Sequence, residues 1–155
     1  MNVKMPVLEC LNEIAASGGG VEIAAAGVEP VLLVMAGSLK TILKRLKEDE
    51  RCRFDFLSSL TAVEYPAYFE VVYHLYSLPL GHRATVKTRV AKDDPQVPSV
   101  ADLWPTAIFQ EREAYDLLGV VFTGHPGLTR ILLPEGFDGH PLRKDYKLPP
   151  RLGMR

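Results

Sequence analysis

Residues 69–90 read FEVVYHLYSLPLGHRATVKTRV, and this stretch decides the fold. Over residues 69–78, Phe, Val, Tyr and Leu alternate with Glu, Val, His and Tyr, and over residues 82–90 Ala, Val and Thr alternate with Arg, Thr and Lys. An alternation of period two is typical of strands in an antiparallel sheet with one solvated face. The break Leu78-Pro79-Leu80-Gly81 separates the two predicted strands.

The patterns on either side of this stretch predict the remaining elements. Helical spacing predicts helices at 5–16, at 38–48 with Ser38 as N-cap, and at 105–118 with Gly119 directly after its end. Apolar runs predict strands at 21–26, 30–36 and 54–64, and a capping box of Ser99 and Asp102 predicts a short helix after a loop at 93–98. Because the strands come in runs, we expect an α+β fold: a mainly antiparallel sheet with helices packed on one face and an extended C-terminal segment.

Size and charge narrow the class of protein. The 155 residues predict one domain, with an α+β body at 1–123 and a C-terminal segment, residues 124–155, that belongs to the same domain. A net charge of −1 gives no general attraction to nucleic acid or anionic lipid. The longest apolar run, Val31–Gly37, is far shorter than the roughly 20 residues that cross a bilayer. We therefore expect a soluble protein without a signal peptide.

The sequence offers no recognisable catalytic, cofactor or metal site. Cys10 and Cys52 are isolated and belong to no CxxC, so we expect them to be reduced and partly buried, with no iron–sulfur cluster. The run Gly18-Gly19-Gly20 follows a helix and matches neither a Walker loop nor GxGxxG. We therefore expect the purified chain to bind neither iron nor flavin, and not to oxidise NADH or reduce quinone by itself.

Two adjacent stretches remain: residues 109–122, FQEREAYDLLGVVF, and residues 124–146, GHPGLTRILLPEGFDGHPLRKDY. The first predicts a charged helix, and the second a long irregular segment of a kind that is usually a functional or binding element. Glu111 and Glu113 point about 200° apart on a helix, so they cannot act as an acid–base pair. Either the helix has a solvated face with Arg112 paired to Asp116, or its carboxylates bind arginines of the segment or of a partner.

We expect residues 124–146 of the C-terminal segment to be ordered against the body of the domain or against a partner, with three cations facing carboxylates. The cations are Arg130, Arg143 and Lys144, and the nearest carboxylates in sequence are Glu111, Glu113 and Asp116. Its larger apolar side chains are expected to bury their area on ordering: Ile131, Leu132, Leu133 and Phe137.

The histidines and the basic end of the segment each admit a simple interpretation. His125 and His140 stand in Gly-His-Pro tripeptides, which predict defined bends rather than a shared metal site. Residues 143–155 carry five basic residues and one acid. They form either a frayed terminus or an extended arm on an acidic partner.

Together the two stretches carry the signature of a known family. The residues of this signature are Glu111-Arg112-Glu113, Tyr115-Asp116, Gly119, His125-Pro126, Arg130, His140-Pro141 and Arg143-Lys144-Asp145. They closely resemble the 30 kDa subunit of respiratory complex I, the NADH–quinone oxidoreductase of bacteria, which has counterparts in chloroplasts and cyanobacteria. The resemblance is dense over about 38 residues, and the pattern from about Ser38 onward fits the α+β domain of that family.

The resemblance implies a non-catalytic, hydrophilic subunit of the peripheral arm, on the cytoplasmic side of the cell membrane and attached to it only through the complex. It gives the signature residues a docking role, with no catalytic, cofactor-binding or metal-binding residue among them. The implied partners are the large quinone-module subunit related to hydrogenase catalytic subunits and other peripheral-arm subunits, and no nucleic acid. The complex is expected to use FMN and iron–sulfur clusters if it is linked to NADH, none of them bound by this chain.

Two alternatives stay open at this point. Related subunits serve membrane hydrogenases and F420 or ferredoxin oxidoreductases, and this chain does not specify the electron donor. A stand-alone module that binds an acidic protein or nucleic acid is the other alternative. Co-purification with a membrane complex would separate a subunit from such a module.

Overall fold

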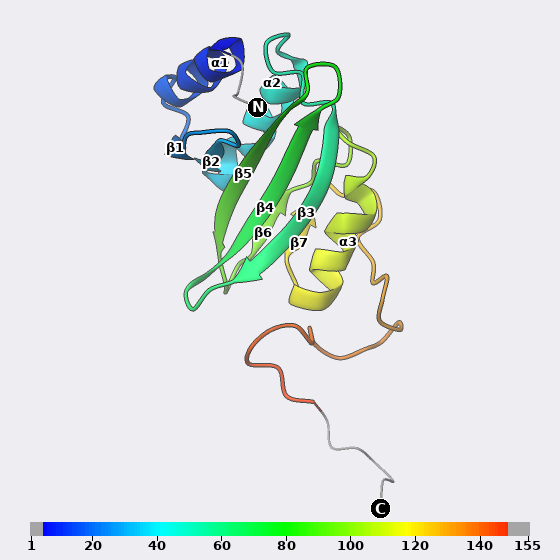
Figure 1. Cartoon of the computed structure of the whole chain (residues 1–155). Coiled ribbons are helices and arrows are strands. Elements are labelled where there is room, and N and C mark those ends of the chain that lie inside the picture. The colour runs from blue at the N-terminus through cyan, green and yellow to red at the C-terminus, as the bar shows by residue number, and fades with distance from the viewer. Residues whose placement is uncertain (1–4, 149–155) are drawn as a thin grey trace, which may run out of the picture.

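The structure, a computed structural model of the chain, describes residues 5–148 (Figure 1). Three helices and seven strands follow one another within these residues. In chain order they are α1 (Met5–Ala16), β1 (Val21–Ala25), β2 (Val31–Val34), α2 (Ala36–Glu48), β3 (Phe56–Glu64), β4 (Tyr68–Ser77), β5 (His82–Ala91), β6 (Gln96–Pro98), α3 (Ala107–Leu118) and β7 (Val121–Thr123). No helix among these residues is both long and apolar enough to cross a membrane.

The main sheet has five strands in the order β1-β2-β5-β4-β3. The antiparallel pairs β3–β4 and β4–β5 confirm the prediction from residues 69–90, with Phe69 opposite Val90 and Tyr73 opposite Val86. The pair β2–β5 is parallel, which the sequence pattern does not reveal, because a parallel and an antiparallel neighbour impose the same alternation. The fold is therefore α+β with a mixed, mainly antiparallel sheet.

One face of this sheet builds the core together with the helices. Val71, Tyr73 and Leu75 of β4 are at most 1% exposed, and they join one cluster with the buried side chains of α1 and α2. Figure 1 shows α3 beside β3, and α1 and α2 near the other end of the sheet. The opposite face carries ion pairs such as Arg89 with Glu70, whose Nε and Oε2 atoms are 3.0 Å apart.

Several predicted boundaries are wrong. Helix α2 begins at Ala36 without a side-chain cap, so Ser38 lies inside it, and α3 begins at Ala107 rather than Pro105. The predicted capping box forms no helix: the Ser99 hydroxyl accepts a 3.2 Å hydrogen bond from the Ala101 N–H and donates to Glu111, and residues 101–103 form a turn. Part of that loop is strand β6, which pairs in parallel with β7, so that the chain before α3 lies beside the chain that follows it.

Candidate functional site

Helix α3 buries two carboxylates rather than presenting a solvated charged face. Glu111 and Asp116 have no exposed surface, whereas Glu113 between them is exposed. Buried carboxylates are costly unless they are paired or hydrogen-bonded. The partners of Glu111 and Asp116 therefore indicate what this helix holds in place.

Glu111 fixes the turn that precedes its own helix. Its Oε2 accepts a 2.6 Å hydrogen bond from the Ser99 hydroxyl, and its Oε1 accepts a 2.8 Å bond from the main-chain N–H of Val100. Burial raises the pKa of Glu111, and these two hydrogen bonds oppose the rise. Glu111 therefore acts mainly inside the body; of the C-terminal segment it approaches His125, whose Nε2 lies 3.9 Å from Oε2, and not Arg130, Arg143 or Lys144.

Asp116 organises the C-terminal segment. Its Oδ2 accepts hydrogen bonds from three successive main-chain N–H groups, those of Ile131 (3.1 Å), Leu132 (2.8 Å) and Leu133 (2.9 Å). Its Oδ1 accepts a 2.8 Å bond from Arg130 Nη1. Burial acts to raise the pKa of Asp116, but the hydrogen bonds together outweigh burial and lower it. The helix thus holds a turn of the segment through a single carboxylate.

Arg130 folds the segment back on itself. Its guanidinium bridges Asp116 to the main-chain carbonyls of Phe137 (2.8 Å) and Gly139 (2.7 Å), and it lies 5.5 Å from the centre of the Phe137 ring. A planar guanidinium with several fixed donors suits such a multiple contact better than an ammonium group. The expectation that Arg130 faces a carboxylate of the helix is confirmed.

Of the two alternatives for the charges of α3, the one that pairs Arg112 with Asp116 along the helix is wrong. Arg112 donates instead to the main-chain carbonyls of Thr129 (3.0 Å) and Arg130 (2.7 Å). Asp116 is buried and already accepts four hydrogen bonds from the segment, whereas Arg112 is only partly buried and reaches carbonyls outside the helix. Both members of the expected pair thus hold the segment rather than each other.

The segment also satisfies the free carbonyls at the end of α3. The carbonyls of Asp116, Leu117 and Leu118 accept hydrogen bonds from His140 Nδ1 (3.0 Å), the Leu142 main-chain N–H (3.0 Å) and Arg143 Nε (2.6 Å). The last four carbonyls of a helix have no partner within it, and this end of a helix favours cations. The C-terminal segment therefore caps the helix.

Gly119 makes this close approach possible. It follows α3 with φ of 78°, a conformation that favours glycine, which confirms its predicted place after the helix. A Cβ atom there would lie 2.5 Å from Arg143 Nη2 and 2.7 Å from His140 Cδ2. The absence of a side chain at Gly119 leaves the space that the segment occupies.

Arg143 and Lys144 do not face the carboxylates of α3 that are nearest in sequence. Arg143 binds the Leu118 carbonyl, and its guanidinium lies 5.3 Å from the centre of the Phe69 ring. Lys144 uses its main-chain N–H, which lies 3.1 Å from Oε1 of Glu64 at the end of β3. No sequence signal points to Glu64, because it stands 80 residues before Lys144 and contacts it only through the fold.

The two histidines lie at opposite ends of α3. His125 Nε2 lies 2.9 Å from the Ile108 carbonyl, and its Nδ1 accepts a 2.9 Å hydrogen bond from the main-chain N–H of Gly127. His140 binds the last turn and lies with its ring centre 5.9 Å from that of Tyr115. Each histidine therefore holds one end of the segment on the helix. Three other signature residues, Pro126, Lys144 and Asp145, are exposed.

The larger apolar side chains of the segment do not all turn inward as expected. Leu132 and Ile131 are 62% and 37% exposed, and only Leu133 and Phe137 are half-buried. Leu142, which follows the second Gly-His-Pro bend, is 60% exposed. Polar contacts therefore hold the described part of the segment, and several of its apolar side chains face outward.

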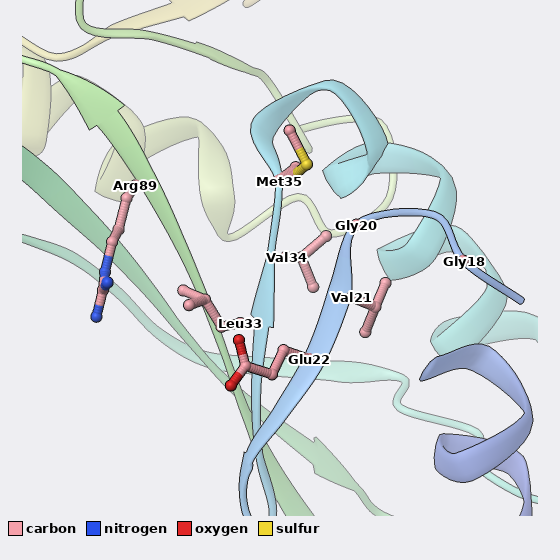
Figure 2. A pocket seen from close by; sticks show the side chains of 8 residues that line it. All are labelled: Gly18, Gly20, Val21, Glu22, Leu33, Val34, Met35 and Arg89. Atoms are coloured by element: carbon pink, nitrogen blue, oxygen red, sulfur yellow. The ribbon is translucent and has the colours of Figure 1, made fainter. Parts of the chain in front are cut away.

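A second region is hollowed at the edge of the sheet (Figure 2). This hollow of about 450 Å³ lies over the ends of β1 and β2 and is lined mainly by Val21, Leu33, Val34 and Met35. Glu22 and Arg89 are its charged residues, and Figure 2 shows them on different strands. The lining contains no nucleophile beside a base, so the hollow resembles an apolar surface groove more than a catalytic site.

Comparison with known proteins assigns the family. Residues 32–151 match the family described as "Respiratory-chain NADH dehydrogenase, 30 Kd subunit". The chain belongs to this family of respiratory-complex subunits. The match begins within β2, so α1 and β1 lie outside it.

Individual relatives agree with the family. The chain is 50% identical over 121 residues to the C subunit of NADH-quinone oxidoreductase from Moorella thermoacetica, covering 77% of this chain and 80% of the relative. It is 47% identical over 114 residues to the C subunit from Acidothermus cellulolyticus, covering 71% of this chain. The chain spans only 59% of the Acidothermus relative and 44% of the one from Chloroherpeton thalassium.

Solved structures share the fold. The chain matches a trypsin-resistant fragment of Nqo5 with a TM-score of 0.67 and 34% identity, over 80% of this chain and all of the fragment. It also matches a chain in an archaeal respiratory membrane complex, the membrane-bound sulfane sulfur reductase. That match has a TM-score of 0.66 and 31% identity, over 77% of this chain and 71% of the other.

Proposed function

We propose that this chain is a non-catalytic subunit of the peripheral arm of a membrane-bound NADH–quinone oxidoreductase, where it supports the quinone-reducing module. The observation that carries this proposal is the C-terminal segment, which polar contacts hold on α3 while Leu132 and Leu142 stay exposed. The names of the bacterial relatives support the assignment to this oxidoreductase. Electron transfer would then take place in other subunits.

In this proposal the C-terminal segment, 124–155, is the docking element of the single domain. Its partner would be the large quinone-module subunit related to hydrogenase catalytic subunits, together with other peripheral-arm subunits. A segment that is already ordered loses less conformational entropy on binding than a free chain does. Burying a leucine side chain fully contributes about 1.5–3 kcal/mol, so Leu132 and Leu142 together supply a useful driving force. Residues 149–155, part of the expected basic arm, lie outside the described residues.

The cofactors follow from the same assignment. The complex would use FMN and iron–sulfur clusters, held by other chains, and this subunit would meet the membrane only through the complex, on its cytoplasmic side. The described residues supply neither a cysteine set for a cluster nor a phosphate-binding glycine loop.

An equivalent role with another electron donor is the second candidate. The match to a chain of an archaeal sulfane sulfur reductase supports it, because the same fold then occurs in a membrane complex of different chemistry. The body and segment would dock in the same way, and only the donor would differ.

Native purification tests the role and identifies the donor. We expect the tagged chain, purified from detergent-solubilised membranes of its own cells, to carry a multisubunit complex that oxidises NADH with quinone. A complex that instead uses ferredoxin, F420 or hydrogen would favour the second candidate. Recovery of the chain as a free monomer would contradict both and favour a stand-alone binding module.

A matched pair of variants tests the docking surface. The double variant Leu132→Glu/Leu142→Glu should lower recovery of partner subunits at least about tenfold, since it places two charges in an apolar contact. Leu78→Glu is the control, because Leu78 is 64% exposed but lies in the turn between β4 and β5. Equal recovery with both variants would contradict docking through the segment.

The Arg143→Ala variant separates docking from chemistry. It should lower subunit stoichiometry, because Arg143 holds the segment on the Leu118 carbonyl. Turnover per intact complex should stay unchanged. Normal stoichiometry with lost turnover would place Arg143 in the reaction itself.

A further inference from the structure

The fold brings together the only two cysteines of the chain. Cys10 lies on α1 and Cys52 follows α2, and both are 0% exposed. The two Sγ atoms and a carboxylate oxygen of Asp49 all lie within 4.8 Å of one another. We propose that Cys10, Asp49 and Cys52 form a binding site for a thiophilic divalent cation, Zn²⁺ in the first instance. From the sequence we expect no metal ligand in this chain, because Cys10 and Cys52 lie far apart along it. The fold places the two side chains next to each other.

The spacing of the three ligand atoms suits tetrahedral Zn²⁺. Bonds of about 2.3 Å to sulfur and 2.0–2.2 Å to carboxylate oxygen place tetrahedral ligand atoms roughly 3.5–3.8 Å apart. The 4.8 Å limit on the separations in this cluster leaves only a small contraction to reach that geometry. Two thiolates and one carboxylate leave one position for water, and the Asp49 side chain, which is 16% exposed, is the part of the cluster that solvent reaches.

Two of the ligands are already positioned by one turn. Asp49 is the C-cap residue of α2, and its main-chain carbonyl accepts a 3.0 Å hydrogen bond from the Cys52 N–H. This Asp-x-x-Cys turn presents both side chains toward Cys10 on α1. A metal would therefore link two elements that are distant in sequence, with little rearrangement of the turn.

The charges around the cluster balance when the metal binds. Zn²⁺ would displace the protons of both thiols, so that two thiolates and a carboxylate bring three negative charges to a dication. Arg51 supplies the remaining positive charge: its Nη2 lies 2.9 Å from Asp49 Oδ2 and its Nε 3.1 Å from Oδ1. Arg51 also binds Glu13 of α1 at 2.9 Å, and Arg45, whose Nη2 lies 4.0 Å from Glu13 Oε2, compensates the charge of Glu13. A charged group that holds a ligating carboxylate in this way tunes and orients the site.

Metal binding would fix α1 to the body. Cys10 precedes the family match at residues 32–151, whereas Asp49 and Cys52 lie inside it. The site therefore joins the part of this chain outside the family match to the part within it. Ligand binding to the folded state raises stability in proportion to the logarithm of ligand concentration over Kd, so α1 should become more resistant to opening with Zn²⁺.

Cobalt titration of the full, reduced chain tests the site directly. Co²⁺ should bind once per chain and give the visible absorption of a tetrahedral ion together with a thiolate-to-cobalt charge-transfer band. Because the chain has two cysteines, that band reports Cys10 and Cys52 alone. Zn²⁺ should displace the cobalt, and binding should release two protons per metal ion near neutral pH.

Variants decide which groups bind. Cys10→Ser and Cys52→Ser should each abolish the tetrahedral spectrum, and Asp49→Asn should weaken Co²⁺ binding. Arg51→Gln should weaken Co²⁺ binding about 10–100-fold, because it removes the guanidinium that holds the Asp49 carboxylate in place. Arg53→Gln is the matched control, because Arg53 is an exposed arginine on the same turn whose hydrogen bonds are made by its main chain, and it should bind Co²⁺ normally.

Three results would overturn the proposal. The first is the absence of a charge-transfer band when Co²⁺ is added to the reduced, folded chain. The second is an unchanged affinity for Co²⁺ in both Asp49→Asn and Arg51→Gln. This second result decides the question even if the cysteine variants do not fold. The third is a chain that carries a Cys10–Cys52 disulfide after purification from its own cells without added oxidant. That disulfide would make the cluster a redox pair instead of a metal site.

Discussion

The body of the molecule and its C-terminal segment are stabilised by opposite means. In the body, residues such as Leu43, Phe54 and Tyr73 are fully buried in one apolar cluster. The segment is held mainly through contacts with Asp116 of α3, including the one from Arg130, and Leu132 faces outward. A segment held by polar contacts keeps its larger apolar side chains available, whereas the body uses most of its apolar side chains in the buried cluster. The difference shows how a segment can be ordered on the body while several of its apolar side chains remain exposed.

The largest expected effect comes from Asp116→Ala. It removes a buried carboxylate that accepts four hydrogen bonds from the segment, and breaking a buried charged contact costs about 3–5 kcal/mol. We expect local opening of residues 124–148, with amide exchange at least about 100-fold faster there and little change in the sheet. Exchange monitored by mass spectrometry makes the measurement.

Glu113→Ala is the control for this experiment. Glu113 is an exposed carboxylate on the same helix, and its removal should change stability by no more than about 0.5 kcal/mol. If Asp116→Ala destabilised the sheet as much as the segment, the two regions would be one cooperative unit and the comparison would be wrong.

In the body, the variant expected to lower stability most is one that opens a cavity in the apolar cluster. Leu43 on α2 is 0% exposed, and Leu43→Ala should lower the free energy of unfolding by about 2–5 kcal/mol. Urea unfolding can be followed by fluorescence of Trp104, the only tryptophan, which is 2% exposed. A loss well below 1 kcal/mol would show that the cluster around α2 is not the main source of stability.

The contact between the two regions should be sensitive at Gly119. Gly119→Ala forces a side chain into a left-handed conformation and against Arg143, at a cost of roughly 1–3 kcal/mol. We expect partial release of the segment, detected as faster trypsin cleavage after Arg130. Gly127→Ala is the matched control, because a Cβ at Gly127 meets nothing within 4 Å and its φ is not positive. Equal cleavage in both variants would contradict a close fit at Gly119.

The sequence predicts the structure of the body and the structure of the C-terminal segment to different extents. The period-two pattern of residues 69–90 predicts β4 and β5 closely, because alternation in an antiparallel pair is a local property of the chain. The parallel pair β2–β5 and the small pair β6–β7 are missed, because nothing local records which distant strand lies alongside. Boundaries that depend on caps, such as the start of α2, shift by two residues.

For the C-terminal segment, the sequence predicts which residues lie near one another better than it predicts their individual contacts. The signature residues Asp116, Arg130 and His140 do meet, and the pairing of Arg130 with Asp116 was predictable from opposite charge. The main-chain contacts of Arg112 and Arg143 were not, because carbonyls carry no sequence signal. Leu132 is expected from the sequence to be buried but is exposed in the structure. A pattern of apolar residues does not distinguish a buried core from an exposed apolar surface.

The smallest expected effect on stability is that of Tyr73→Phe in the body, and it tests whether the body depends on buried polar groups. Tyr73 is fully buried on β4, and its hydroxyl has no hydrogen-bond partner among the described residues. Burial raises the pKa of this hydroxyl, which stays neutral, and removing an unpaired buried polar group is nearly neutral or stabilising. Tyr73→Phe should therefore change the free energy of unfolding by no more than about 0.5 kcal/mol, or raise it. Ser99→Ala, which removes a 2.6 Å hydrogen bond to buried Glu111, should cost about 1.5–3 kcal/mol in the same urea titration. If Tyr73→Phe cost as much as Ser99→Ala, the sheet would depend on its buried polar groups as the segment does, and the contrast between the two regions would fail.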